Sequence, residues 1–249
     1  MPVCQTTDGV AVSLSTKRIR TQDLTNGPTL EDIGSIDFNN AGKDSKDEYL
    51  QHMNLILADF LTNFPAQYEY CKSQIIAVRN LKAQGLESKE FNDVKAYRRS
   101  PHNFPDNSGI SSSLAVLRAK AHELIAIFDG IQDWILAHIP TIKDEDNSGV
   151  EVQEAVVTQI AGYYKVIKGI YSEEMDYVSR RAELETSHLK QPASDSWMRA
   201  IILHDSQEWD DIENCWRALI RVIMLGQNLL IRNFEKLKEP RSKQRAMHI

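Results

Sequence analysis

The sequence predicts an all-α protein, an elongated up-down bundle of four long helices. Three observations support this fold class. Apolar residues recur at steps of three and four along four long segments, which is the period of an amphipathic helix. Glycine and proline are scarce, with 11 and 8 among 249 residues, so a fold of many short strands would lack turn formers. Prolines separate the four segments, and proline ends helices because it lacks a backbone N–H.

Residues 1–43 precede the bundle, which we place in residues 44–249. The first segment is rich in Thr, Ser, Asn, Asp and Gly and has no helical period. We expect a flexible arm there, because such a composition buries too little apolar surface to fold. A short strand through Val10, Val12 and Leu14 is the alternative.

The first helix is expected to begin at a capping box that runs from Ser45 to Glu48. In this motif the hydroxyl and the carboxylate satisfy the free amides of a helix start. Pro65 lies inside the apolar run that follows, and we expect a kink there because its ring excludes one backbone hydrogen bond. Residues 85–112 then break the helical period with Pro, Gly, Asn and Ser, which predicts a long mobile loop.

The second helix follows this loop and is stopped by Pro140. A second capping box, from Ser148 to Glu151, predicts the start of the third helix. The fourth helix runs from about Ser194 to Pro240. At a rise of about 1.5 Å per residue the third and fourth helices would each span about 60 Å, which makes the bundle elongated.

The fourth helix carries apolar side chains on nearly every face in residues 219–231, LIRVIMLGQNLLI. A helix that is apolar all round must be covered all round. The sequence therefore predicts tight homo-oligomerisation. A ring is one closed arrangement, but the helical period does not give the number of subunits.

Composition excludes several classes of protein. Lysine and arginine number 29 against 35 acidic residues, a formal charge of −6, so we expect no nucleic-acid partner. No apolar run approaches the length of a membrane span or forms a secretory signal, so we expect no membrane partner. The three cysteines, Cys4, Cys71 and Cys215, are far apart. Their number and spacing predict neither a disulfide nor a zinc site, and fit a reducing intracellular compartment.

Patterns that carry catalysis or nucleotide binding are missing, so we expect no enzyme, no cofactor and no metal. The one partial motif is the E-x-x-H of Glu185 and His188, which is the half-site of ferritin-like di-iron bundles. No second copy accompanies it. A metal-carboxylate bundle at these two residues is the first alternative function, and a helical scaffold or adaptor is the second.

Charge is distributed unevenly along the chain. From Lys143 to Glu154 there are one positive and five negative charges, and from Arg232 onward six positive and two negative. An up-down order of helices places this acidic segment and the basic C-terminal segment at the same end of the bundle. Favourable charge at helix termini is a sufficient reason for both features.

The segment Ile139 to Glu154 resembles the activation loop of the ATP-independent proteasome activators, the REG or eleven-S regulators. The positions that match are Pro140, Ile142, Asp144, Asn147, Gly149, Val150, Gln153 and Glu154. Pro240-Arg241-Ser242 and the residues after it resemble the family's tail, and Asn63 to Pro65 resemble the kink of its first helix. The resemblance covers about residues 45–249 and is closest to the gamma-type, homoheptameric subunit.

This resemblance implies a heptameric ring that sits on the α-subunit ring of the core proteasome and admits peptides through its channel. The C-terminal tail, residues 240–249, would anchor the ring through Met247, His248 and Ile249. The activation loop, residues 139–150, would hold the gate open. The loop residues to which the resemblance assigns this role are Pro140, Ile142, Asp144, Glu145, Asp146, Asn147 and Gly149.

The sequence also departs from the family pattern. Glu145 replaces a glycine and Ser148 replaces a bulkier apolar residue, which predicts a stiffer or more acidic loop. Arg98-Arg99 stand in the long loop where the nuclear member of the family carries a basic signal. We expect location in the nucleus, the cytoplasm or both, with the nucleus favoured.

Overall fold

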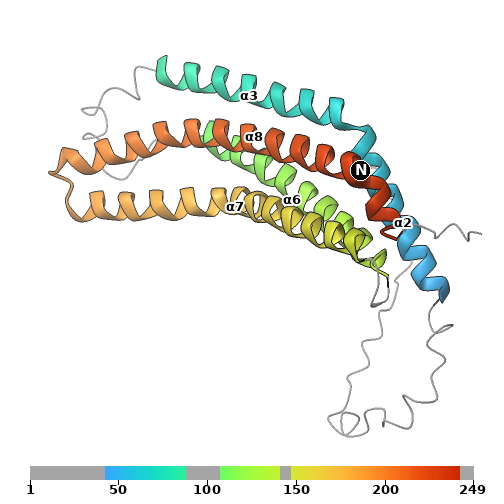
Figure 1. Ribbon diagram of the computed structural model, residues 1–249. Helices are drawn as coiled ribbons and strands as arrows, with labels where there is room; N and C mark the ends of the chain where they lie inside the picture. Colours follow the sequence, from blue (N-terminus) through green and yellow to red (C-terminus); the bar gives the residue numbers. More distant parts are fainter. Residues whose placement is uncertain (1–42, 88–106, 141–146, 242–249) are drawn as a thin grey trace, which may run out of the picture. The chain divides into compact units, whose positions relative to one another are not determined.

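The computed structural model describes residues 43–87, 107–140 and 147–241 (Figure 1). These ranges hold five helices and no strand, which confirms the all-α fold class. The helices are α2 (Lys43–Thr62), α3 (Phe64–Glu87), α6 (Ser108–Ala137), α7 (Ser148–Lys190) and α8 (Asp195–Lys238). The chain divides into two compact units, Met1–Lys46 and Asp47–Ile249, and the second unit holds the bundle.

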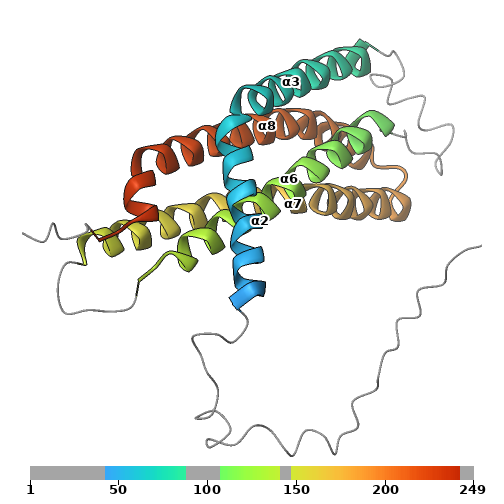
Figure 2. The ribbon, with the colours of Figure 1, turned by 90° about the vertical axis from the view of Figure 1, so that its right-hand side faces the viewer.

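The first predicted helix is split into α2 and α3 at Asn63, which confirms the kink expected near Pro65. The backbone remains hydrogen-bonded across the break, because Asn63 N donates to Asp59 O at 2.9 Å and Gln67 N donates to Asn63 O at 3.0 Å. Proline is tolerated in the first turn of α3, where its missing N–H has no partner to lose. The helix axis changes direction at this point (Figure 2).

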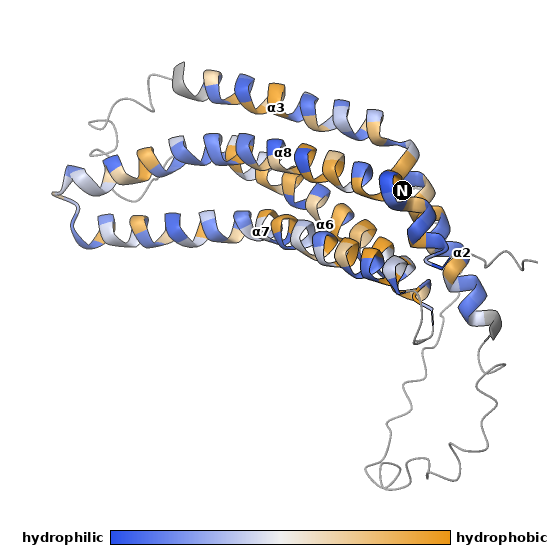
Figure 3. Cartoon of the chain, viewed as in Figure 1, coloured by the Kyte–Doolittle hydropathy of each residue, from blue (hydrophilic) through white to orange (hydrophobic). Residues whose placement is uncertain are grey.

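The bundle is closed by four pairs of packed helices. Helix α6 packs on α7, α7 on α8, α3 on α8, and α6 on α8. The pair α2 and α3 therefore takes the place of the first of the four predicted helices. Helix α6 is the most apolar of the five helices, as the hydropathy colouring in Figure 3 shows. It packs against both α7 and α8.

The long predicted loop, residues 85–112, is wrong at both of its boundaries. Helix α3 continues to Glu87 and α6 begins at Ser108. Asn107 caps α6, since its side-chain oxygen accepts from the N–H of Ile110. The serines that suggested a loop fit the helix because Ser112 and Ser113 donate back to the carbonyl of Gly109. The remainder of the predicted loop lies outside the described residues.

Both predicted capping boxes are also wrong. Helix α2 starts at Lys43, so Ser45 stands within its first turn. Helix α7 starts at Ser148 with Asn147 as its N-cap, one residue earlier than predicted. Asparagine is at least as good an N-cap as serine, and here it takes that position. The start of α8 agrees with the prediction, with Ser194 as its N-cap.

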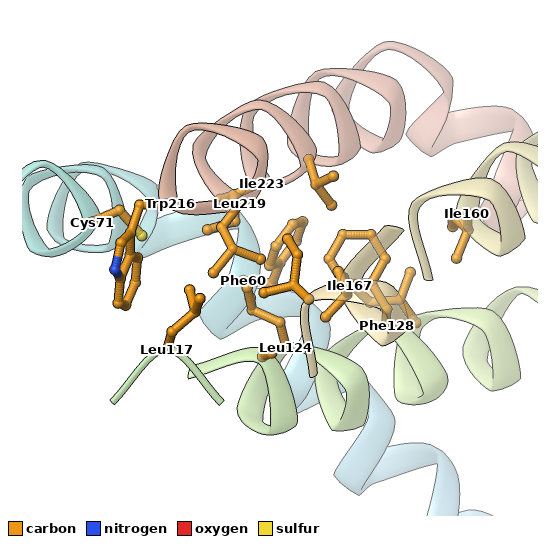
Figure 4. Packing of buried hydrophobic residues seen from close by; sticks show 14 of the residues in the cluster. Phe60, Cys71, Leu117, Leu124, Phe128, Ile160, Ile167, Trp216, Leu219 and Ile223 are labelled. Atoms are coloured by element: carbon orange, nitrogen blue, oxygen red, sulfur yellow. The ribbon is translucent and has the colours of Figure 1, made fainter. Parts of the chain in front are cut away.

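The core joins side chains from every helix (Figure 4). Phe60 of α2 meets Phe128 of α6 edge to face, with ring centroids 5.5 Å apart. Trp216 of α8 is almost fully buried, and Cys71 of α3 is fully buried. Burial raises the pKa of the Cys71 thiol to about 11, which is the behaviour of a structural cysteine.

Charged pairs join α3 to α8 on the outside of the bundle. Glu213 accepts from Arg79 at 2.7 and 3.0 Å and also pairs with Arg217. The hydrogen bond from Arg79 is the main cause that lowers the pKa of Glu213 to about 2. Lys82 pairs with Asp210 further along the same two helices.

The apolar surface predicted for residues 219–231 is only partly covered within one chain. Leu219 and Ile223 are buried, whereas Met224, Leu225 and Ile231 are 47%, 38% and 57% exposed. Other large apolar side chains on α7 and α8 are equally uncovered: Val166, Met175, Val178 and Leu203. In the part of the chain that the structure describes, no helix is both long and apolar enough to cross a membrane.

Candidate functional site

Three helix ends meet at one end of the bundle. The chain leaves α6 through His138 to Pro140, enters α7 at Asn147, and leaves α8 through Glu239 to Arg241 (Figure 1). We call this region, residues 138–140, 147–153 and 237–241, the junction. It brings together the two ends of the predicted activation loop and the start of the predicted tail.

Gln153 links all three helix ends. Its side-chain amide donates to the carbonyl of His138 at 3.1 Å and to the carbonyl of Leu237 at 2.8 Å. The side chain is fully buried. Carbonyl groups in the last turn of a helix lack partners within that helix, so one amide satisfies acceptors at the ends of α6 and α8.

Gly149 and Pro240 make the closest backbone contact of the junction. A Cβ on Gly149 would overlap the carbonyl oxygen of Pro240 and would lie 2.6 Å from its carbonyl carbon. Only glycine lets two backbones approach this closely. The first turn of α7 therefore rests directly on the backbone that follows α8.

Asn147 and Arg241 add a hydrogen bond on the outer side of this contact. The side-chain oxygen of Asn147 accepts from the Arg241 guanidinium at 3.2 Å. The backbone carbonyl of Asn147 accepts the N–H of Glu151 at 3.0 Å, as an N-cap does. Asn147 thus belongs both to the start of α7 and to the contact with the chain after α8.

Arg241 stands between two hollows of about 320 and 330 Å³. The larger is lined in part by apolar residues of the loop ends, and the smaller by charged residues of α8. Besides Arg241, the residues that line the larger hollow include Ile139, Pro140 and Val150. Those that line the smaller hollow include Glu235, Lys236 and Glu239. Both lie at the junction, where the predicted activation loop and the predicted tail begin.

An aromatic group supports the junction from inside the bundle. Trp134 stacks on Phe234 at 5.9 Å between ring centroids and contacts His138 at 4.3 Å. Its indole N–H donates to Asn54 of α2 at 2.8 Å. The His138 ring nitrogen Nδ1 is 2.7 Å from the Trp134 carbonyl. These contacts around the buried Trp134 fix the end of α6 against α2 and α8.

The junction contains some of the residues predicted from the sequence. Pro140, Asn147 and Gly149 lie together there. The other predicted site residues lie outside the described residues: Ile142, Asp144, Glu145, Asp146, Met247, His248 and Ile249. The prediction that the loop and the C-terminal segment share one end of the bundle is confirmed by the Asn147–Arg241 contact.

Gln153 and Arg241 were not among the predicted site residues, although both stood in matching motifs. Only their positions within these motifs could have indicated a role, because glutamine and arginine are common on helix surfaces. The structure shows that Gln153 is buried and that Arg241 reaches back to Asn147.

The two residues of the metal-carboxylate alternative make other contacts in the structure. Glu185 pairs with Arg181, and His188 is buried between helices. Within residues 43–87, 107–140 and 147–241 no three His, Cys, Asp or Glu side chains are grouped so that they could hold a metal ion.

The fold is that of the helical-bundle proteasome activators. Residues 103–247 match the family model described as "Proteasome activator PA28, C-terminal". The chain belongs to this family, which confirms the resemblance. The family is one of regulators and not of proteases.

Among curated relatives, proteasome activator 28 of Dictyostelium discoideum is 31% identical over 119 residues, which covers 48% of this chain and 53% of that protein. Proteasome activator complex subunit 3 of Gallus gallus is 24% identical over 169 residues, covering 66% and 65%. The chain thus spans between about half and two thirds of the length of these relatives.

Solved structures share the fold at low sequence identity. The 11S subunit of the Plasmodium falciparum proteasome, PA28, has a TM-score of 0.63 at 22% identity, with 83% of this chain and 97% of that chain covered. A chain in the complex of the yeast 20S proteasome with the activator PA26 from Trypanosoma brucei has a TM-score of 0.68 at 17% identity, with 82% and 97% covered. These values establish the fold.

Proposed function

We propose that the protein is an ATP-independent activator of the core proteasome. A ring of subunits docks on the α-subunit ring through the C-terminal tails, and the activation loops hold the gate open so that peptides enter. The observation that carries this proposal is the junction, where Asn147 contacts Arg241 and Gly149 contacts Pro240. In a chain of the PA28 family, this contact between the start of α7 and the chain after α8 supports a loop and a tail that act together.

The proposed mechanism uses binding energy and no chemistry. The gate is a two-state element, and contacts made only with its open state shift the population toward that state. A single tail of a few residues is a weak ligand, but tails presented together on a ring gain effective concentration. The protein needs no nucleotide, cofactor or catalytic group for this role. PA26 is named as an activator in a solved complex with a 20S proteasome, which supports the same role here.

The uncovered apolar side chains of α7 and α8 support assembly into a ring, for which the family resemblance implies seven subunits. Met175 and Leu203 are 69% and 62% exposed in a single chain, and side chains of this kind gather at interfaces between subunits. Native mass spectrometry is expected to give a particle near seven times 28.4 kDa. A stable dimer as the largest species would contradict the proposed ring.

Replacing Asn147 by alanine is expected to abolish stimulation while docking is largely retained. The substitution removes the acceptor for Arg241 and the loop side chain at the start of α7, but leaves the tail unchanged. The assay is hydrolysis of fluorogenic peptides by purified core proteasome without ATP, with complex formation measured on native gels. Failure of the unaltered protein to stimulate hydrolysis would reject the proposed function and favour a scaffold or adaptor role.

Deleting Ile249 is expected to abolish docking itself. In the proposed mechanism this residue anchors the tail between α subunits, so that stimulation and complex formation are lost together. Surface plasmon resonance with immobilised core proteasome measures the loss directly. Full binding by the shortened chain would reject the assignment of the tail as the anchor.

A further inference from the structure

Gln153 is a buried polar side chain whose hydrogen bonds go to other helix ends and not to its own helix. It stands in the second turn of α7, and both of its acceptors belong to other helices. The carbonyl of His138 lies two residues before Pro140, where the described chain enters the activation loop. The carbonyl of Leu237 lies three residues before Pro240, where the tail begins.

The side-chain amide is well suited to this double contact. A glutamine amide has two N–H donors and no charge, so it can serve two carbonyls without bringing an ion into the core. Methionine would fill a similar volume without donors, and glutamate would oppose two acceptors with its own oxygens.

Stability alone does not account for a glutamine at this position. Its side-chain oxygen Oε1 is buried and has no hydrogen-bond partner among the described residues. An unpaired buried acceptor is unfavourable. The residue is thus an imperfect choice for core packing, but a good choice for holding two chain ends at a fixed separation.

We propose that Gln153 is a positioning residue, which holds the exits to the activation loop and to the tail in one fixed register. When the tail docks, the activation loop is then held in the position relative to the α-subunit ring that opening of the gate requires. This inference rests on the proposed function and adds a coupling element to it. The coupling follows from geometry, because the distances from one amide nitrogen to both carbonyl oxygens are 3.1 and 2.8 Å.

The test is the substitution Gln153→Met, with Gln227→Met as a matched control. Gln227 of α8 makes the same kind of bond, from its amide to the carbonyl of Leu61 at 2.7 Å, but joins α8 to α2 away from the junction. Both variants lose an amide-to-carbonyl contact between helices. Peptide hydrolysis at saturating activator, the dissociation constant for core proteasome and thermal unfolding are measured for each.

For Gln153→Met we expect maximal stimulation to fall by about tenfold or more, which corresponds to a modest shift of a two-state gate. Its dissociation constant is expected to change by less than about threefold, since the tail itself is intact. Gln227→Met is expected to lower the unfolding temperature and to leave maximal stimulation unchanged. The shorter Gln153→Asn, which keeps the donors, is expected to lose less stimulation than Gln153→Met.

Hydrogen exchange in the free particle gives a readout that does not need the proteasome. The backbone amides of residues 138, 139, 237–239 and 241 are expected to exchange faster in Gln153→Met and not in Gln227→Met. Unchanged exchange, or stimulation within about twofold of the unaltered protein, would overturn the inference. An equal loss of docking and stimulation would also overturn it. Failure of the unaltered protein to stimulate rejects the proposed function instead, and exchange then decides whether Gln153 fixes the two exits.

Discussion

Replacing Gly149 by alanine is expected to eliminate stimulation of the core proteasome. A Cβ at this position would overlap the carbonyl oxygen of Pro240 and lie 2.6 Å from its carbonyl carbon. Both are backbone atoms, so no rotamer change relieves the overlap. The start of α7 and the chain after α8 must separate, which moves the loop relative to the tail. Overpacking of this kind costs about 1–3 kcal/mol of folding stability.

Gly162→Ala is the matched control for this substitution. Gly162 lies in the same helix, and a Cβ there would meet no atom within 4 Å. Alanine has the higher helix propensity, so the free energy of unfolding is expected to rise by about 0.5–1 kcal/mol. Urea unfolding and peptide hydrolysis are measured for both variants. Gly149→Ala protein with full stimulation would show that the Gly149–Pro240 contact has no functional role.

The period of the apolar residues predicted the helices well, because a long stripe with this period lies on one face only when the chain is helical. Most of the apolar stripes of α6, α7 and α8 is buried as expected, whereas Val178, which the period placed on the stripe of α7, is 50% exposed. The helix ends were harder to predict, because several neighbouring residues compete for each N-cap position. Asn147 took the cap position from Ser148, and Asn107 began α6 ahead of the serine-rich segment. A window of sequence holds several residues able to cap a helix, and tertiary contacts select among them.

The candidate site was predicted in part, because its residues stood in motifs. Its geometry was not accessible from sequence. Gln153 bonds to residues 15 and 84 positions away, and such long-range pairs have no local signal. The need for glycine at position 149 likewise depends on Pro240 lying against it.

Glu208 is another residue whose environment the sequence does not reveal. It stands in α8, a helix with many acidic side chains, yet it is only 3% exposed. Its Oε1 oxygen has no hydrogen-bond partner among the described residues. Burial, and after it the nearby negative charges of Glu173, Asp211 and Asp205, together raise the pKa of Glu208 to about 8.

Replacing Glu208 by glutamine is expected to stabilise the protein, increasingly so at higher pH. Below the ordinary glutamate pKa of 4.5 the carboxyl is neutral in both folded and unfolded chains, and the substitution has little effect. Between that pKa and about 8 the unfolded chain loses its proton more readily than the folded one, so the folded state of the unaltered protein becomes progressively less stable. Glutamine removes this penalty. We expect a gain of about 1–3 kcal/mol in the free energy of unfolding at about pH 8.

Glu213 lies five residues further along the same helix, and its pKa is shifted in the opposite direction. The substitution Glu213→Gln therefore tests the sign of the predicted change in stability with pH. The hydrogen bonds from Arg79 and Arg217 lower the pKa of Glu213 to about 2, so its carboxylate stabilises the fold above the ordinary pKa and loses this effect as the pH falls toward 2. Urea unfolding at fixed protein concentration across this range should therefore show Glu208→Gln gaining stability with rising pH and Glu213→Gln losing it. A destabilised Glu208→Gln protein at pH 8 would contradict the cost of burial. It would mean that the carboxylate of Glu208 is paired with a cationic group from outside the described residues of a single chain.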